Sequence, residues 1–194
     1  MAPDGKKDER HEIPTHIKVV AIVAFILATS LVAATMTLAW KGQFKVMQIK
    51  NVDLKQLESF GGKLQFTAKY WVLPMIWLIT RWQTVVHKRV TSRAIDPLSG
   101  NEHVVEEANK ILNNSVEQLL MSVISQVSLL SYLTPEQTVT LIPLINGWHV
   151  VGRIAFWLGY PKYRTFGVMS TLTPTVTSVG FCLYRFLTAD LALF

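Results

Sequence analysis

Long apolar stretches alternate with short polar segments along this chain. Residues 19–40 and 165–184 contain no charged side chain, and a helix needs about 20 apolar residues to cross the hydrocarbon core of a bilayer. Residues 111–134 and 136–158 are also predominantly apolar, and Pro135 separates them as a helix breaker. This pattern predicts an all-α, polytopic membrane protein.

A further apolar stretch, residues 64–86, is less uniform than the others. The uncharged segment between Lys69 and Arg81 is too short to cross a bilayer alone. The stretch spans the membrane only if both basic side chains reach outward toward the headgroups, and Pro74 is expected to kink it. We include it as a membrane helix, which brings the predicted number of spans to five.

The first apolar stretch follows a positively charged tail, as in a secretory signal peptide. It is longer than the roughly 7–15 apolar residues of a signal peptide, and Trp40 is placed as an interfacial anchor. An uncleaved transmembrane helix is therefore favoured. The predicted organisation is a cytosolic tail at 1–16, an extra transmembrane helix at 17–41, a connecting loop at 42–62 and a four-helix membrane domain at 63–194. Within the loop, residues 44–49 are interpreted as a short strand or an interfacial segment.

The composition supports this class of protein and excludes others. Of 194 residues, 50% are hydrophobic and 16% are charged, against about 25% charged in average soluble domains. An ordinary soluble enzyme, a disordered chain and a disulfide-stapled chain are therefore excluded, and the single Cys182 cannot form an intramolecular disulfide. The net charge of +6 comes from basic residues near the ends of the apolar stretches, where membrane lipid explains them better than nucleic acid. Their distribution favours a cytosolic amino terminus.

Polar side chains that could bind a ligand recur on two of the predicted helices. They are Lys110, Asn114 and Glu117 on one helix, Arg153, Trp157 and Tyr160 on the next, and Arg164 just after it. In each helix the spacing places the three residues on one face. Two such faces lining one crevice suit a zwitterionic ligand, because cations bind carboxylates, a glutamate binds an ammonium group and a tyrosine donates a hydrogen bond. No metal-ligand spacing is present.

A structural role for the same residues is the alternative. Intramembrane charges are costly and pair with one another even where no ligand binds. Glu117 would then pair with Arg153 or Lys110 and lock the bundle. Gln126 and His149 are expected to make interhelical hydrogen bonds.

These residues belong to three motifs that occur in order along the chain. The first is the basic stretch HKRVTSR at 87–93, followed by a proline–glycine turn. The second is an Asn-x-x-Glu element at 114–117, and the third is GRIAFWLGY at 152–160 with RTFG at 164–167. The arrangement resembles the MAPEG superfamily, the membrane-associated proteins in eicosanoid and glutathione metabolism. With its extra amino-terminal helix, the chain is most similar to the mattrin-type members of that superfamily.

The resemblance implies a MAPEG-like four-helix transmembrane bundle preceded by one extra transmembrane helix. It also implies a homotrimer that binds glutathione between subunits at the cytosolic side. The residues that match the glutathione ligands are Asn114, Glu117, Arg153 and Tyr160, and Lys110 stands at the position of a further ligand, where an arginine is usual. Arg164 would stand in for the catalytic arginine that activates the thiol. Two residues depart from the superfamily pattern. Gln118 replaces a tyrosine that occurs in some members, and Phe156 replaces a tyrosine or histidine.

Two functions follow from the resemblance. The first is a mattrin-like membrane protein of the endoplasmic reticulum, Golgi or lysosome, with membrane-protein partners and a scaffolding, trafficking or receptor-regulatory role. The second is a glutathione-dependent transferase, peroxidase or isomerase that acts on a lipophilic electrophile. An unrelated five-span bundle, with motifs that match by coincidence, is the remaining alternative.

Overall fold

Five long α-helices carry the fold. The computed structural model describes residues 14–43, 52–92, 94–95 and 100–190, and these residues contain helices and no strand. The long helices are α1 (Thr15–Trp40), α2 (Phe60–Thr91), α3 (Glu106–Leu130), α4 (Pro135–Gly159) and α5 (Thr165–Arg185). Three short elements accompany them: η1 (Leu54–Glu58), η2 (Glu102–Val104) and η3 (Phe186–Asp190). The all-α prediction is confirmed.

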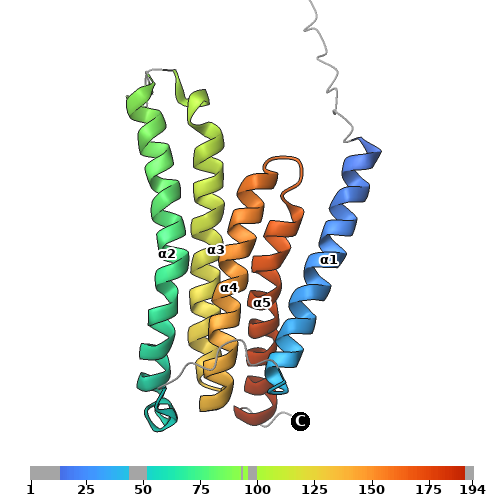
Figure 1. Cartoon of the computed structure of the whole chain (residues 1–194), viewed down its shortest axis with the longest axis vertical. Helices are drawn as coiled ribbons and strands as arrows, with labels where there is room; N and C mark the ends of the chain where they lie inside the picture. The colour runs from blue at the N-terminus through green and yellow to red at the C-terminus, as the bar shows by residue number, and fades with distance from the viewer. Residues whose placement is uncertain (1–13, 44–51, 93, 96–99, 191–194) are drawn as a thin grey trace, which may run out of the picture.

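Successive long helices run in opposite directions, as Figure 1 shows. The start of α1, the connection from α2 to α3 and the turn from α4 to α5 therefore lie at the same end of the molecule, and α2 and α3 project beyond the α4–α5 turn at that end (Figure 1). The helix α1 packs against α5 and α4, whereas α2 packs against α3 and α4. The extra helix is thus joined to one side of a bundle formed by the other four.

Three of the described helices, α1, α4 and α5, are long and apolar enough to cross a membrane. The helices α2 and α3 are also long, with 32 and 25 residues, but they carry more charged side chains. They pack in the same bundle as the three apolar helices. The chain is therefore a membrane protein, and the crossing of the bilayer by α2 and α3 stays a prediction.

Local signals explain where the helices begin. The Ser59 hydroxyl accepts a hydrogen bond from the backbone N–H of Gly62 at 3.0 Å, so α2 begins at Phe60, earlier than its apolar pattern indicates. Thr134 and Gln137 form a capping box at the start of α4. The expected loop at 42–62 thus contains η1 and the first residues of α2. Of the predicted tail at 1–16, residues 1–13 lie outside the described residues, as does the segment 44–49, and α1 already begins at Thr15.

The helices α4 and α5 approach each other closely at two glycines. A Cβ atom on Gly167 would lie 2.2 Å from the backbone nitrogen of Phe156 and 2.5 Å from the carbonyl oxygen of Gly152. A Cβ atom on Gly152 would lie 2.6 Å from Cγ2 of Thr171. Small residues at a helix crossing allow such backbone contact inside membranes, and here they bring Arg153 of α4 within reach of α5.

The connection from α2 to α3 is held by a two-pronged ion pair. The Arg89 guanidinium donates to both carboxylate oxygens of Glu102, at 2.8 and 3.0 Å, and to the carbonyl of Ala94 at 3.1 Å. We expect Arg89→Gln to loosen this connection while costing only about 1 kcal/mol of stability, because both side chains are partly exposed. Limited proteolysis between residues 94 and 105 should accelerate. Equal cleavage of wild type and variant would contradict a holding role.

Candidate functional site

Arg153 is the centre of a buried hydrogen-bonded cluster that joins three helices. Its side chain is fully buried in α4. One terminal nitrogen donates to Oδ1 of Asn114 on α3 and the other donates to Oγ1 of Thr171 on α5, each at 2.8 Å. Thr171 in turn donates to Oε1 of Gln118 at 3.2 Å. Neutral groups thus accept from both terminal nitrogens, whereas the buried Nε of Arg153 has no hydrogen-bond partner in the described part of the chain. The ring of Phe156 lies 4.9 Å from the guanidinium.

A second buried polar cluster lies further from the α4–α5 turn. Oε1 of Gln126 accepts hydrogen bonds from the indole of Trp71 at 3.2 Å and from the amide of Asn146 at 2.8 Å. The Gln126 amide donates to Ser122 at 3.0 Å. The prediction that Gln126 bonds between helices is confirmed, since it joins α3 to both α2 and α4. His149 is buried, and its Nδ1 makes no hydrogen bond with the described part of the chain.

The structure separates Glu117 from the two cations proposed as its partners. Glu117 is exposed on the outer surface of α3. Arg153 bonds to Asn114 and Thr171 instead, and Lys110 forms an ion pair with Glu106 at 2.6 Å. Both ion pairs found in the described residues exclude Glu117. The expectation that Glu117 locks the bundle by pairing with either cation is therefore wrong for a single chain.

Tyr160 and Arg164 lie together at the α4–α5 turn. The Arg164 guanidinium is 5.8 Å from the centre of the Tyr160 ring and is exposed. The six predicted site residues thus form two contacts, Asn114 with Arg153 and Tyr160 with Arg164, while Lys110 and Glu117 remain on the surface of α3. One subunit by itself does not bring them together into a single pocket.

The ion pair of Lys110 with Glu106 gives a pH-dependent prediction. Both residues lie in the first turns of α3, where that helix projects beyond the α4–α5 turn. A hydrogen bond from Lys110 and its positive charge hold the pKa of Glu106 below its usual value. The contribution of the pair to stability is therefore complete above the unfolded-state pKa of the glutamate and is lost as the pH falls through the lowered folded-state pKa.

We expect a carbon-detected NMR titration of the Glu106 carboxyl to show this lowered midpoint. Replacing Lys110 with methionine should raise the midpoint, because the hydrogen bond and the positive charge are both removed. A midpoint that does not move in Lys110→Met would contradict the pairing.

Sequence reasoning missed a cation in contact with two aromatic rings that pack edge to face. The guanidinium of Arg81 on α2 lies 4.5 Å from the ring centres of both Trp77 and Trp157. Arg81 and Trp157 line a cavity of about 300 Å³ between α2, α3 and α4, together with Lys88 and Glu107. The signal in the sequence was the Trp77–Arg81 spacing of one helical turn; that Trp157 of α4 completes the arrangement depends on tertiary packing.

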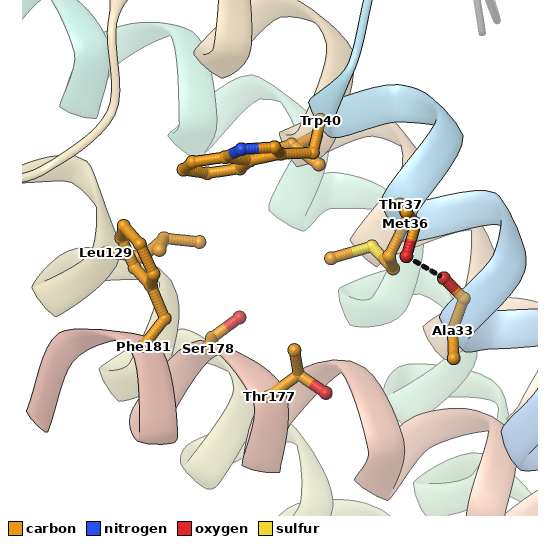
Figure 2. Close-up of a pocket in the computed structure, with 9 residues that line it drawn as sticks. Ala33, Met36, Thr37, Trp40, Leu129, Thr177, Ser178 and Phe181 are labelled. Carbon is orange, nitrogen blue, oxygen red and sulfur yellow. Dashed lines mark hydrogen bonds between the residues drawn. The ribbon is translucent and has the colours of Figure 1, made fainter. Parts of the chain in front are cut away.

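An apolar pocket of about 260 Å³ lies where α1 joins the bundle. Figure 2 shows Met36 and Trp40 of α1 across the pocket from Ser178 and Phe181 of α5. Trp40 and Phe181 pack edge to face with ring centres 5.0 Å apart, and the Ser178 hydroxyl donates to a carbonyl of its own helix. Among the described residues no charged side chain lines this pocket, and its apolar lining packs the extra helix against the bundle.

The fold and its buried polar clusters define an all-helical membrane protein. Comparison with protein-family models, curated protein sequences and solved structures gives no match. The resemblance to the MAPEG superfamily therefore depends on the sequence motifs alone and stays a prediction.

Proposed function

We propose that this chain is a mattrin-like, MAPEG-type protein of internal membranes with a scaffolding, trafficking or receptor-regulatory role. The helices α2 to α5 would be the MAPEG-like domain and α1 the appended helix, with the amino terminus in the cytosol. Homotrimers of this domain would present membrane-facing surfaces to partner proteins. The observation that carries this proposal is the outward-facing carboxylate of Glu117.

Several large apolar side chains are exposed beside Glu117, although the exposed Asn113 lies one turn before it. Val116, Leu120 and Ile124 on the same helix have exposed fractions of 45%, 59% and 57%. Glu117 lies about 17 Å along α3 from its first residue, at 1.5 Å per residue. A carboxylate at membrane depth is costly unless it meets a partner or water. A neighbouring subunit that covers this face and donates to Glu117 would remove that cost.

The other predicted ligand residues also favour a structural role over catalysis. Both terminal nitrogens of Arg153 are already hydrogen-bonded within the bundle. Gln118 and Phe156, which replace hydroxyl or imidazole side chains of the superfamily pattern, are buried in the same core. Lys110 is engaged by Glu106. A ligand would have to displace these contacts to use the same donors.

The oligomeric state tests the proposal. Light scattering of the full chain in mild detergent should give a trimer for the wild type. We expect Glu117→Gln to dissociate the trimer, whereas Glu136→Gln, which changes an exposed glutamate in the first turn of α4, should leave it intact. A monomeric wild type, or a trimer unaffected by Glu117→Gln, would contradict assembly through this face and favour an unrelated bundle or a different interface.

The second candidate function is a glutathione-dependent transferase, peroxidase or isomerase. The observation in its favour is that the Asn114–Arg153 and Tyr160–Arg164 contacts lie toward the same end of the bundle. In a trimer, Lys110 and Glu117 of one subunit would face the neighbour and complete the set. The exposed Arg164 cation would stabilise a bound thiolate, the form of the thiol that attacks an electrophile.

Calorimetric titration of glutathione into the detergent-purified protein separates the two candidates. An enzyme should give saturable heat that Glu117→Gln abolishes while the trimer remains assembled. A trimer that takes up no glutathione would favour the scaffolding role and direct the search to protein partners. Dissociation of the trimer by Glu117→Gln would assign that carboxylate to assembly.

A further inference from the structure

Arg81 is oriented as a hydrogen-bond donor whose partner is missing. The rings of Trp77 and Trp157 each lie 4.5 Å from its guanidinium. The two ring centres are 6.1 Å apart and the ring planes meet at 65°, so the rings enclose the guanidinium from two sides without both lying parallel to it. Nε is enclosed and has no hydrogen-bond partner, and Arg81 bonds to no other described residue. The two rings thus position a half-buried guanidinium whose enclosed Nε has no hydrogen-bond partner in the described part of the chain.

The cavity beside Arg81 contains further unpaired charges. It measures about 300 Å³ and is lined by Arg81, Thr84 and Lys88 from α2, by Glu107 from α3 and by Trp157 from α4. In the described part of the chain the ion pairs are Arg89–Glu102 and Lys110–Glu106. Two cations and one carboxylate therefore surround one cavity without neutralising each other. A ligand with a negative centre and a positive tip matches that charge pattern.

The position of the cavity along the bundle indicates the source of such a ligand. Trp157 lies two residues before the end of α4 at Gly159, and α4 is one of the helices that can span a membrane. Tryptophan and basic side chains at a helix end lie at the level of lipid headgroups, and basic pockets between membrane helices bind the headgroups of lipids. With α4 spanning a bilayer, the cavity would lie at the level of the phospholipid phosphates.

We propose that this cleft binds the headgroup of an amine-bearing phospholipid. Arg81 and Lys88 would contact the phosphate oxygens, since an oriented guanidinium fits a phosphate with two parallel hydrogen bonds. Glu107 would accept hydrogen bonds from the ammonium group and select such lipids over purely anionic ones. The shared chemistry is that of a phosphate group, which lipid and free phosphate both carry. This site is separate from the contacts of Asn114 and Arg153.

Titration calorimetry on the full chain in mild detergent tests the site. The probes are dihexanoyl-phosphatidylethanolamine, dihexanoyl-phosphatidylglycerol and inorganic phosphate. We expect the ethanolamine lipid to bind saturably and Arg81→Gln to weaken it about tenfold or more, the effect of losing hydrogen bonds to a charged group. Lys162→Gln, which removes an exposed charge at the α4–α5 turn, should leave the affinity unchanged.

The selectivity of the site is tested by Glu107→Gln. This variant should lose the preference for the ethanolamine lipid over the glycerol lipid, because the acceptor for the ammonium group is gone. Inorganic phosphate that binds as tightly as the lipid would overturn the headgroup as the source of the phosphate. Since Arg81→Gln also disturbs the contacts with the two tryptophan rings, Lys88→Gln provides a second test that leaves those contacts in place. Wild-type affinity in both variants would overturn the proposal.

Discussion

Replacing Gly167 with alanine is expected to separate α4 from α5 and to unfold the bundle under mild conditions. The added Cβ would lie 2.2 Å from a backbone nitrogen and 2.5 Å from a backbone oxygen of α4, and backbone atoms cannot rotate away as a side chain can. We expect a loss of at least about 3 kcal/mol, at the upper end of overpacking effects. The gain of about 1 kcal/mol in helix propensity does not offset it.

The same helix provides a matched control. A Cβ atom on Gly180 would meet nothing within 4 Å, so Gly180→Ala should be neutral or stabilising by up to about 1 kcal/mol. Chemical denaturation in mild detergent, followed by helical circular dichroism, measures both variants. Equal midpoints for Gly167→Ala and Gly180→Ala would show that α4 and α5 are not in backbone contact at this position.

Replacing Arg153 with alanine is expected to be the most damaging change of a polar side chain. It empties a fully buried site and removes the donors to Asn114 and Thr171. The cavity and the two acceptors that lose their donor together should cost about 3–5 kcal/mol. Arg164→Ala is the matched control, because Arg164 is exposed and exposed substitutions usually stay within about 0.5 kcal/mol.

A double-mutant cycle isolates the contact between helices α3 and α4. We expect Arg153→Ala and Asn114→Ala to be non-additive by about 1.5–3 kcal/mol, the usual range for a hydrogen bond to a charged group. Denaturation of the two single variants and the double variant gives this coupling energy. Additive losses would mean that Asn114 does not stabilise the buried cation, and that another acceptor takes its place.

The helices were predictable because each depends on nearby residues. Uncharged stretches, Pro135 and the polar segments between them locate the ends of α4 and α5 within a few residues. The end of α2 was less predictable. Its charged last turns continue to Thr91. A polar helical turn that projects beyond the bundle and a polar loop have the same hydropathy, so hydropathy alone does not tell them apart.

The candidate site was predictable only in part. Helical spacing correctly placed Asn114 and Arg153 on faces that meet. Helical spacing also grouped Glu117 with Asn114, yet Glu117 is exposed and Asn114 is half-buried. Residues three apart on a helix do not point in the same direction, so at the edge of a packed face one can be covered while the other is exposed. Thr171 and Gln118 complete the Arg153 cluster. Thr171 carried no signal of its own, and Gln118 was noted only as a departure from the superfamily pattern.

By itself the sequence determined the class of protein, the helices and the residues whose charge is costly in a membrane, because these depend on composition and on contacts within one or two turns. Tertiary structure decided which neutral groups accept hydrogen bonds from Arg153, that Glu117 faces outward, and that Trp157 of α4 joins Trp77 around Arg81. Those outcomes depend on how closely and at what rotation two helices pack. The glycines at the α4–α5 crossing fix that approach through the volume they leave empty.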